Sequence, residues 1–207
     1  LSQNCSDDEV EEVIITASGG PFLNKPIAEL QNMKPSQAIK HPNWNMGKKI
    51  SVDSANLMNK VFELIEASKL FKFNVNKYRI MIHPQSYVHS IIRFKNGLTK
   101  MILHDTDMKI PISNTIYGSK NRLSSIKKIS ANNLSKMTFS EVDSKRYPAI
   151  KFLKKILKDG PMASTIINAA NEELVKLFLG KEIKFTDIVK NLNMIIRLKE
   201  YNKYAKK

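Results

Sequence analysis

The chain has 207 residues, of which 42% are hydrophobic, so it is long enough to bury a sizeable core in one domain or two small ones. No apolar run approaches the roughly 20 residues of a membrane span, the acidic first residues do not resemble a signal peptide, and Cys5, the single cysteine, excludes an internal disulfide or a thiolate metal cage. The formal charge of +15 favours an anionic ligand, but abundant Lys, Asn and Ile together indicate an AT-rich genome and weaken the case for a nucleic-acid partner.

The first half of the sequence predicts a mixed α/β (α+β) unit with a small sheet. A β-branched run ends at Ser18-Gly19-Gly20-Pro21, which is typical of a buried strand followed by a tight loop. Hydroxyl and carboxylate side chains at Asp53 and Ser54 are typical of a helix start. The expected elements are a strand at 13–17, a helical turn at 35–40, a loop at 41–51, a helix from Asp53 or Ser54 to about Phe71, and strands at 78–82, 88–94 and 98–103.

The second half predicts a helical unit. Residues 113–140 have short apolar runs among Ser, Asn and Lys, and we expect a loop there with one more strand. Helical periodicity follows, interrupted at Asp159-Gly160-Pro161 and Gly180-Lys181. The expected helices are at 149–158, 163–179 and 185–199. The sequence thus predicts an α/β domain at 1–142 and a small C-terminal helical bundle at 143–207.

The helix expected after Ser54 has two different faces. One stripe is mainly apolar and consists of Leu57, Val61, Leu64, Ile65 and Ser68. Asn59, Glu63 and Glu66 lie close together on the opposite face, with Lys60 at its edge. A solvated face with one Lys60–Glu63 pair is the simpler interpretation, and a ligand site is the alternative.

Two features of this region can bind an anion. The Ser18-Gly19-Gly20 loop can bring backbone N–H groups and a hydroxyl against phosphate oxygens, although a simple turn is an alternative. Ser54, at the expected helix start, offers its hydroxyl and the unpaired first-turn N–H groups.

Aromatic and histidine side chains are the remaining candidates. His41 and Trp44 lie in a loop where a large ring can close over a ligand, with a packed Trp as the alternative. His83 and His89 flank a turn, where a lone His is more often structural than a ligand. Glu63 alone cannot hold a divalent ion, because such cations take several oxygen ligands.

Several motifs together resemble the 1-deoxy-D-xylulose 5-phosphate reductoisomerase family. In the first part of the chain they are Ser18-Gly19-Gly20-Pro21-Phe22, residues 41–50, which begin with His41-Pro42-Asn43-Trp44, Asp53-Ser54-Ala55 and Met58-Asn59-Lys60. Further along they are His83-Pro84-Gln85-Ser86 with His89-Ser90, Asp107-Met108 with Pro111-Ile112, Arg146-Tyr147-Pro148, and residues 168–172. Their order and spacing fit over nearly the whole chain.

The resemblance implies an activity and its partners. The family converts a keto-sugar phosphate to 2-C-methyl-D-erythritol 4-phosphate in the non-mevalonate isoprenoid pathway, by a metal-assisted rearrangement and hydride transfer from NADPH. It implies Mn²⁺ or Mg²⁺ as a second cofactor, a homodimer joined through the small sheet, no nucleic-acid or membrane partner, and a bacterial cytoplasm or a plastid-type organelle.

The resemblance also implies a role for each matching residue. Those expected to bind the substrate are Ser18, His41, Ser54, Asn59, Lys60, Glu63 and Ser86. Glu63 is the expected metal ligand and, with His41 and Trp44, a catalytic residue. Trp44 and Met46 are expected to form a flap, and Met46, Gly47 and Met108 to contact the nicotinamide cofactor. His89 is expected to contact the residues that bind the ligand without touching the ligand itself.

The sequence also departs from the family pattern. It has neither the Gly-rich fingerprint of a Rossmann domain nor the acidic motif that gives the other metal ligands, and its C-terminal helical domain is expected to be shortened. Val61 stands in place of a Gly, and Gly118-Ser119-Lys120 replaces a Trp/Tyr-Pro pair. We therefore expect these 207 residues to be inactive alone. The alternatives are a basic nucleic-acid-binding module and an inactive remnant of the enzyme.

Overall fold

The computed structural model describes residues 6–71, 73–120 and 128–206. Its strands are β1 (Val10–Ala17), β2 (Tyr78–Ile82), β3 (Val88–Phe94), β4 (Thr99–Leu103) and β5 (Ser140–Glu141). Its helices are α1 (Pro35–Ala38), α2 (Lys48–Asn56), α3 (Met58–Phe71), α4 (Lys109–Tyr117), α5 (Ala131–Ser135), α6 (Leu153–Asp159), α7 (Ala163–Leu179), α8 (Phe185–Ile195) and α9 (Lys199–Ala205). Short 3₁₀ helices are η1 (Ile27–Asn32), η2 (Val75–Lys77), η3 (Gly118–Lys120) and η4 (Pro148–Phe152).

The strands form one mixed sheet in the order β4-β3-β1-β2-β5. β1 runs parallel to β2, with Ala17 opposite Ile82, and antiparallel to β3. β3 pairs with β4, and β2 with β5, in antiparallel fashion. The ends of β1, β2 and β4 and the start of β3 therefore meet at one edge of the sheet, where the loops that follow or precede them gather.

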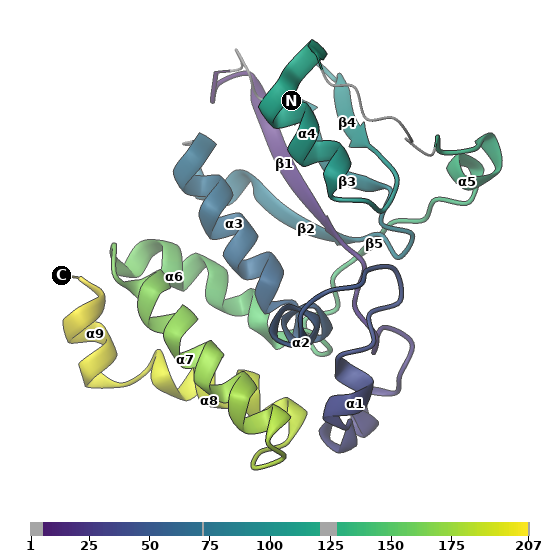
Figure 1. Cartoon of the computed structure of the whole chain (residues 1–207). Helices are drawn as coiled ribbons and strands as arrows, with labels where there is room; N and C mark the ends of the chain where they lie inside the picture. The colour runs from purple at the N-terminus through teal and green to yellow at the C-terminus, as the bar shows by residue number, and fades with distance from the viewer. Residues whose placement is uncertain (1–5, 72, 121–127, 207) are drawn as a thin grey trace.

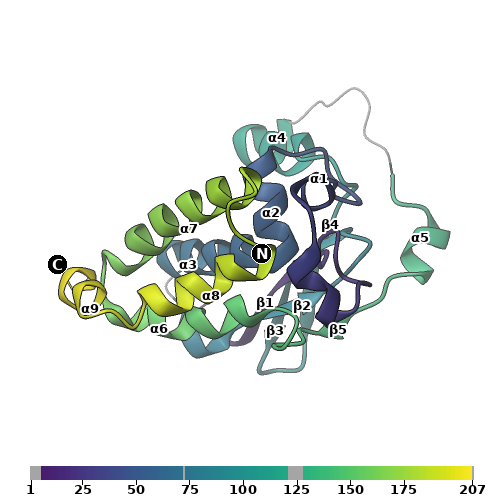
Figure 2. The same cartoon turned by 90° about the horizontal axis from the view of Figure 1, so that it is seen from below.

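Helix α3 lies between the sheet and the helices α6–α9 (Figure 1). Seen from below, α7 and α9 lie on the opposite side of the molecule from β4 and β5 (Figure 2). Leu57, Val61, Leu64 and Ile65 are buried, so the predicted apolar stripe is confirmed. Val61 is fully buried in the main hydrophobic cluster, which contains residues from both halves of the chain. The division near residue 143 stays a prediction.

The predicted fold class is confirmed, and so are the strands of the first half, with β1 beginning three residues earlier than expected. The single helix expected from residue 53 or 54 to 71 is wrong. Helix α2 already begins at Lys48, and the chain breaks at Leu57, which has a left-handed φ of 64°. The Asn56 side chain then accepts a hydrogen bond from the Met58 N–H (2.9 Å) and starts α3. Ser54 thus lies in the last turn of a helix.

Other expected elements also differ from the structure. The described residues of the region 113–140 include helices in α4 and α5, and the short strand β5 begins at its last residue, Ser140. Residues 121–127 lie outside the described part of the chain. The helix expected over 185–199 ends at Ile195, and extended backbone at Leu198 separates it from α9. Gly118, with φ of 53°, ends α4. Within the described ranges, no helix combines the length and apolarity needed to cross a bilayer.

Candidate active site

A cavity of about 440 Å³ opens at the sheet edge where the strand ends meet. It is lined by every predicted site residue except Gly47, namely Ser18, His41, Trp44, Met46, Ser54, Asn59, Lys60, Glu63, Ser86 and Met108. These side chains come from the loop after β1, the loop before α2, the α2–α3 junction, the turn before β3 and the segment after β4. The fold thus brings together groups that are up to 90 residues apart.

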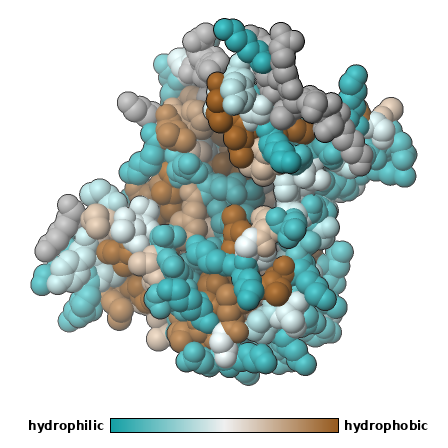
Figure 3. Space-filling view, viewed as in Figure 1, coloured by the Kyte–Doolittle hydropathy of each residue, from teal (hydrophilic) through white to brown (hydrophobic). Residues whose placement is uncertain are grey.

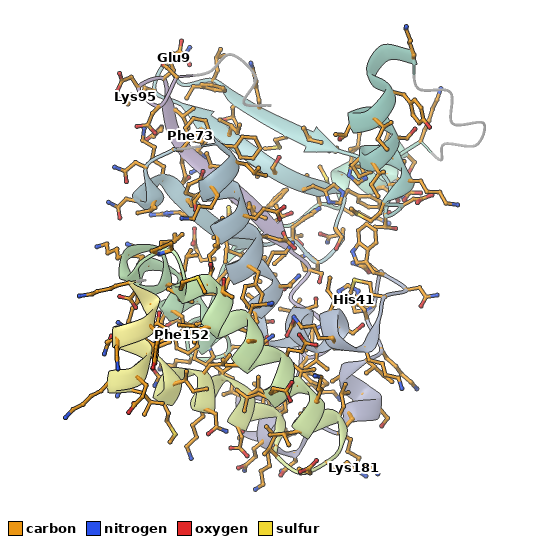
Figure 4. The ribbon with its side chains drawn as sticks, turned by 60° about the vertical axis from the view of Figure 1, so that its left-hand side comes forward. Glu9, His41, Phe73, Lys95, Phe152 and Lys181 are labelled. Atoms are coloured by element: carbon orange, nitrogen blue, oxygen red, sulfur yellow. The ribbon has the colours of Figure 1, made fainter. Side chains whose placement is uncertain are left out.

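His41 lies on the loop that leads into α2 (Figure 4) and fixes the hydroxyl of Ser18. Its Nδ1 accepts the backbone N–H groups of Asn43 (3.1 Å) and Trp44 (3.0 Å). In a neutral imidazole the hydrogen is then on Nε2, which is 2.9 Å from Ser18 Oγ and donates to it. Ser18 Oγ also accepts the N–H of Gly20 (3.1 Å), so its own hydrogen is left to point at a ligand.

We expect the pH dependence of His41 to report this arrangement. Burial first, and the charge of Lys60 second, lower the pKa of His41 from 6.5 to about 4. The neutral loop is therefore fully stable above pH 6.5 and loses stability as the pH falls from 6.5 toward 4, because only the unfolded chain gains the proton there. Long-range ¹H–¹⁵N NMR spectra should show the hydrogen on Nε2 at pH 7. A hydrogen on Nδ1, or a midpoint near 6.5, would contradict the assignment.

The first turns of α3 supply the charged groups of the cavity. Lys60 Nζ lies 2.7 Å from Glu63 Oε2, so the predicted pair is confirmed, with side-chain exposures of 16% and 40%. The amide of Asn59 donates to Glu63 at a long distance of 3.4 Å, and its Oδ1 has no hydrogen-bond partner among the residues that the structure describes. The helix N-terminus near the cavity is that of α3. The prediction that Ser54 starts a helix, and that the first-turn N–H groups after it bind an anion, is therefore wrong. Ser54 still lines the cavity.

Glu63 is the single acidic residue that lines this cavity in the described part of the chain. It also lines an adjoining cavity of about 560 Å³, together with Asn59 and Glu66. Among the described residues, no group of three or more His, Cys, Asp and Glu side chains is placed to hold a metal ion. One carboxylate supplies only part of the oxygen shell of a divalent cation, so these residues do not complete a metal site by themselves.

The loop before α2 is tied to the turn that precedes β3. Ser86, in that turn, has a left-handed φ of 58°. The amide of Asn43 donates to Ser86 Oγ (2.9 Å) and to the carbonyl of Pro84 (2.6 Å). Sequence reasoning gave Asn43 no role, because the contact joins residues more than 40 positions apart. These bonds hold the loop that carries Trp44 over the cavity.

A row of rings forms one wall of the cavity. Trp44 packs edge-on against His89, with 6.2 Å between the ring centroids, and His89 stacks on His104, with 3.7 Å between the centroids. Burial first, and His104 second, lower the pKa of His89 to about 4. In the described part of the chain, His89 Nε2 has no hydrogen-bond partner. Sequence reasoning missed His104. The hairpin turn at Asn96-Gly97 could have predicted its position, because counting outward along the two strands places His104 beside the start of β3.

The remaining predicted residues are placed differently. His83 is fully buried. Its Nε2 accepts a hydrogen bond from the N–H of Tyr87 (3.1 Å), and its Nδ1 donates one to the carbonyl of Thr138 (2.9 Å). These contacts agree with a structural role. Met108 is half exposed at the cavity wall. Gly47 is the residue before α2 and does not line the cavity.

Gly20 brings the two serine-bearing segments together. Its φ is 67°, and a Cβ built on it would lie 2.7 Å from the carbonyl oxygen of Ser54 and 2.8 Å from the Cα of Ala55. The loop after β1 therefore rests directly on the last turn of α2. This contact needs a glycine, because any side chain would separate Ser18 from Ser54.

Comparisons with known proteins match nearly the whole length of the chain. A family model described as the 1-deoxy-D-xylulose 5-phosphate reductoisomerase C-terminal domain matches residues 1–71, and a second, the DXP reductoisomerase C-terminal domain, matches residues 103–207. The 1-deoxy-D-xylulose 5-phosphate reductoisomerase of Pelagibacter ubique (strain HTCC1062) is 45% identical over 204 residues, which are 99% of this chain and 53% of that protein.

Two solved structures are similar as well. The 1-deoxy-D-xylulose 5-phosphate reductoisomerase from Zymomonas mobilis in complex with NADPH is 36% identical, with a TM-score of 0.85 over 97% of this chain and 51% of its own. A DOX-P reductoisomerase in complex with NADPH, fosmidomycin and magnesium is 33% identical, with a TM-score of 0.91 over 98% of this chain and 50% of its own. The chain spans about half the length of the relatives it matches.

Proposed function

Because this chain belongs to the 1-deoxy-D-xylulose 5-phosphate reductoisomerase family, we propose that its cavity binds the phosphate of that sugar substrate. The observation that carries the proposal is the hydroxyl of Ser18. Its oxygen already accepts from His41 and Gly20, so its hydrogen is free to donate to an anion. Within the described ranges, Lys60 is the one ammonium that lines the cavity, which suits a single phosphate better than a nucleic acid.

Asn59, Lys60 and Ser54 support the same proposal. Lys60 can turn from Glu63 to a phosphate oxygen, because their pair is partly exposed and weak. Among the described residues the Oδ1 of Asn59 has no hydrogen-bond partner, so its amide can rotate on binding and present Nδ2 to a phosphate oxygen instead. The positive end of the α3 dipole adds to the attraction.

We further propose that Glu63 contributes one carboxylate to a Mn²⁺ or Mg²⁺ site that other ligands complete. When bound, the ion would stabilise negative charge that develops on the substrate oxygens. Trp44 and Met46, which line the cavity, would exclude water from the reacting carbon. Met108, at the cavity wall, and Gly47, next to the lining residue Met46, would contact NADPH. A bacterial cytoplasm is the proposed compartment, in line with the bacterial relative.

Lys60→Ala is the direct test of the phosphate site. We expect the affinity of the chain for 1-deoxy-D-xylulose 5-phosphate to fall roughly 10–100-fold, since a charge-assisted hydrogen bond is lost. Isothermal titration calorimetry measures this, and Lys69→Ala, the same change near the other end of α3, serves as the control. Equal affinities of the Lys60→Ala and Lys69→Ala variants would refute the proposal. It would also be refuted if the unaltered chain did not bind the sugar phosphate, which is the result expected of an inactive remnant.

We also propose a homodimer joined at β4. This edge strand is exposed along its whole length, and apolar side chains lie next to polar ones on the face that carries α4 (Figure 3). The exposed apolar residues are Leu98, Met101, Ile102, Leu103, Ile112 and Ile116. Edge strands with such side chains pair readily with a second chain. Sedimentation equilibrium should give twice the mass of the monomer for the unaltered chain. The Ile102→Lys variant should have the mass of the monomer.

A further inference from the structure

Two side chains far along the sequence hold the loop after β1 from behind. Tyr147, 2% exposed, donates its hydroxyl to the carbonyl of Gly19 (2.8 Å), and Arg146 donates from Nη1 to the carbonyl of Phe22 (2.9 Å). Tyr147 is itself anchored, because its N–H binds Asp143 O (2.9 Å) and η4 begins at the next residue. Neither residue lines the cavity around Ser18.

The hydrogen bond of Tyr147 has a consequence on the other side of the same peptide group. The carbonyl of Gly19 and the N–H of Gly20 belong to one trans peptide and point in opposite directions. Because the carbonyl faces Tyr147, the N–H faces Ser18 Oγ, to which it donates at 3.1 Å. The orientation of the Ser18 hydroxyl therefore depends on a group that never touches the ligand.

This peptide group needs such a restraint. Gly19 and Gly20 both have positive φ angles, of 83° and 67°, and two consecutive glycines leave little steric barrier to rotation of the peptide between them. After a rotation, the carbonyl of Gly19 would face Ser18 and the cavity. A carbonyl oxygen there would repel a phosphate and would leave the hydroxyl of Tyr147 buried without an acceptor.

We propose that Tyr147 is a positioning residue that fixes the Gly19–Gly20 peptide, and through it the Ser18 hydroxyl, for phosphate binding, with Arg146 holding the far end of the loop. The inference rests on the phosphate site proposed above. Burial raises the pKa of Tyr147 to about 12, so its hydroxyl remains a donor at any physiological pH.

Tyr147→Phe in the complete 207-residue chain is the test. We expect a roughly tenfold loss of affinity for inorganic phosphate and for 1-deoxy-D-xylulose 5-phosphate, and faster hydrogen exchange of the Gly20 N–H. Tyr78→Phe is the matched control, because Tyr78 is also buried and also donates to a backbone carbonyl, that of Ala67 (3.1 Å). The control should lose similar thermal stability but keep its phosphate affinity and Gly20 exchange rate.

A double-mutant cycle separates positioning from a general loss of structure. With Ser18→Ala in place, Tyr147→Phe should weaken phosphate binding little further, whereas with Lys60→Ala the two losses should multiply. Arg146→Met, a change at a partly exposed side chain, should give a smaller loss of the same kind, and it replaces Tyr147→Phe if that variant does not fold.

The possible results distinguish this inference from its premise. Unchanged phosphate affinity in Tyr147→Phe, or equal coupling to Ser18 and Lys60, overturns the positioning role while the phosphate site stands. If Ser18→Ala and Lys60→Ala both bind phosphate normally, the proposed function fails and the inference fails with it. In that case faster Gly20 exchange in Tyr147→Phe would show only a structural hydrogen bond.

Discussion

Glu63→Gln is expected to reduce turnover at least about 1,000-fold in a catalytically active protein that contains this chain, because a carboxylate that binds a divalent ion becomes a weak amide ligand. The fold should survive, since the pair with Lys60 is partly exposed and contributes little to stability. Metal-free phosphate binding should stay equal or become stronger, because the replacement removes the negative charge 2.7 Å from Lys60.

The opposite signs of these effects make the prediction specific. Titrating Mn²⁺ into wild-type and variant proteins measures metal affinity, and calorimetry with inorganic phosphate measures the anion site. Glu66→Gln is the matched control, since Glu66 lies one turn further along α3 and lines only the adjoining cavity. Similar small losses in Glu63→Gln and Glu66→Gln, or a loss of phosphate affinity in Glu63→Gln, would contradict the assigned role.

Local sequence signals predicted the strands and the buried face of α3 well. The β-branched run before Ser18 and the apolar stripe that includes Leu64 depend on period and composition, which a single sequence displays. The break at Leu57 left no such signal, because a leucine rarely takes a left-handed conformation, and Leu57 also fits the apolar stripe as a buried residue. One long helix was therefore expected where the structure has two.

The composition of the site was predictable to a similar extent. Lys60 and Glu63 are neighbours through helical spacing alone, so their pair followed from the sequence. Asn43, His104 and Tyr147 act through contacts between residues distant in the chain, and these depend on strand order and loop paths. The role of His41 in binding the ligand stays a prediction, and in the structure both its nitrogens make hydrogen bonds within the protein.

Gly20→Ala is expected to have the largest effect on the cavity as a whole. A Cβ at this position would lie 2.9 Å or less from three backbone atoms of Ser54 and Ala55, and these atoms cannot move without shifting α2. The left-handed φ adds about 1–2 kcal/mol of strain. We expect destabilisation of roughly 3 kcal/mol or more, which corresponds to a fall in Tm of roughly 6–12 °C for a chain of this size.

Folded Gly20→Ala should also bind 1-deoxy-D-xylulose 5-phosphate at least about 10-fold more weakly, because Ser18 and Ser54 would be held further apart. Gly97→Ala isolates the backbone strain, since Gly97 has a φ of 85° but open space around its Cβ. That control should lose about 1–2 kcal/mol of stability and no affinity. If differential scanning calorimetry and titration gave the two variants the same stability and affinity, the close contact between the loop and α2 would have no part in forming the site.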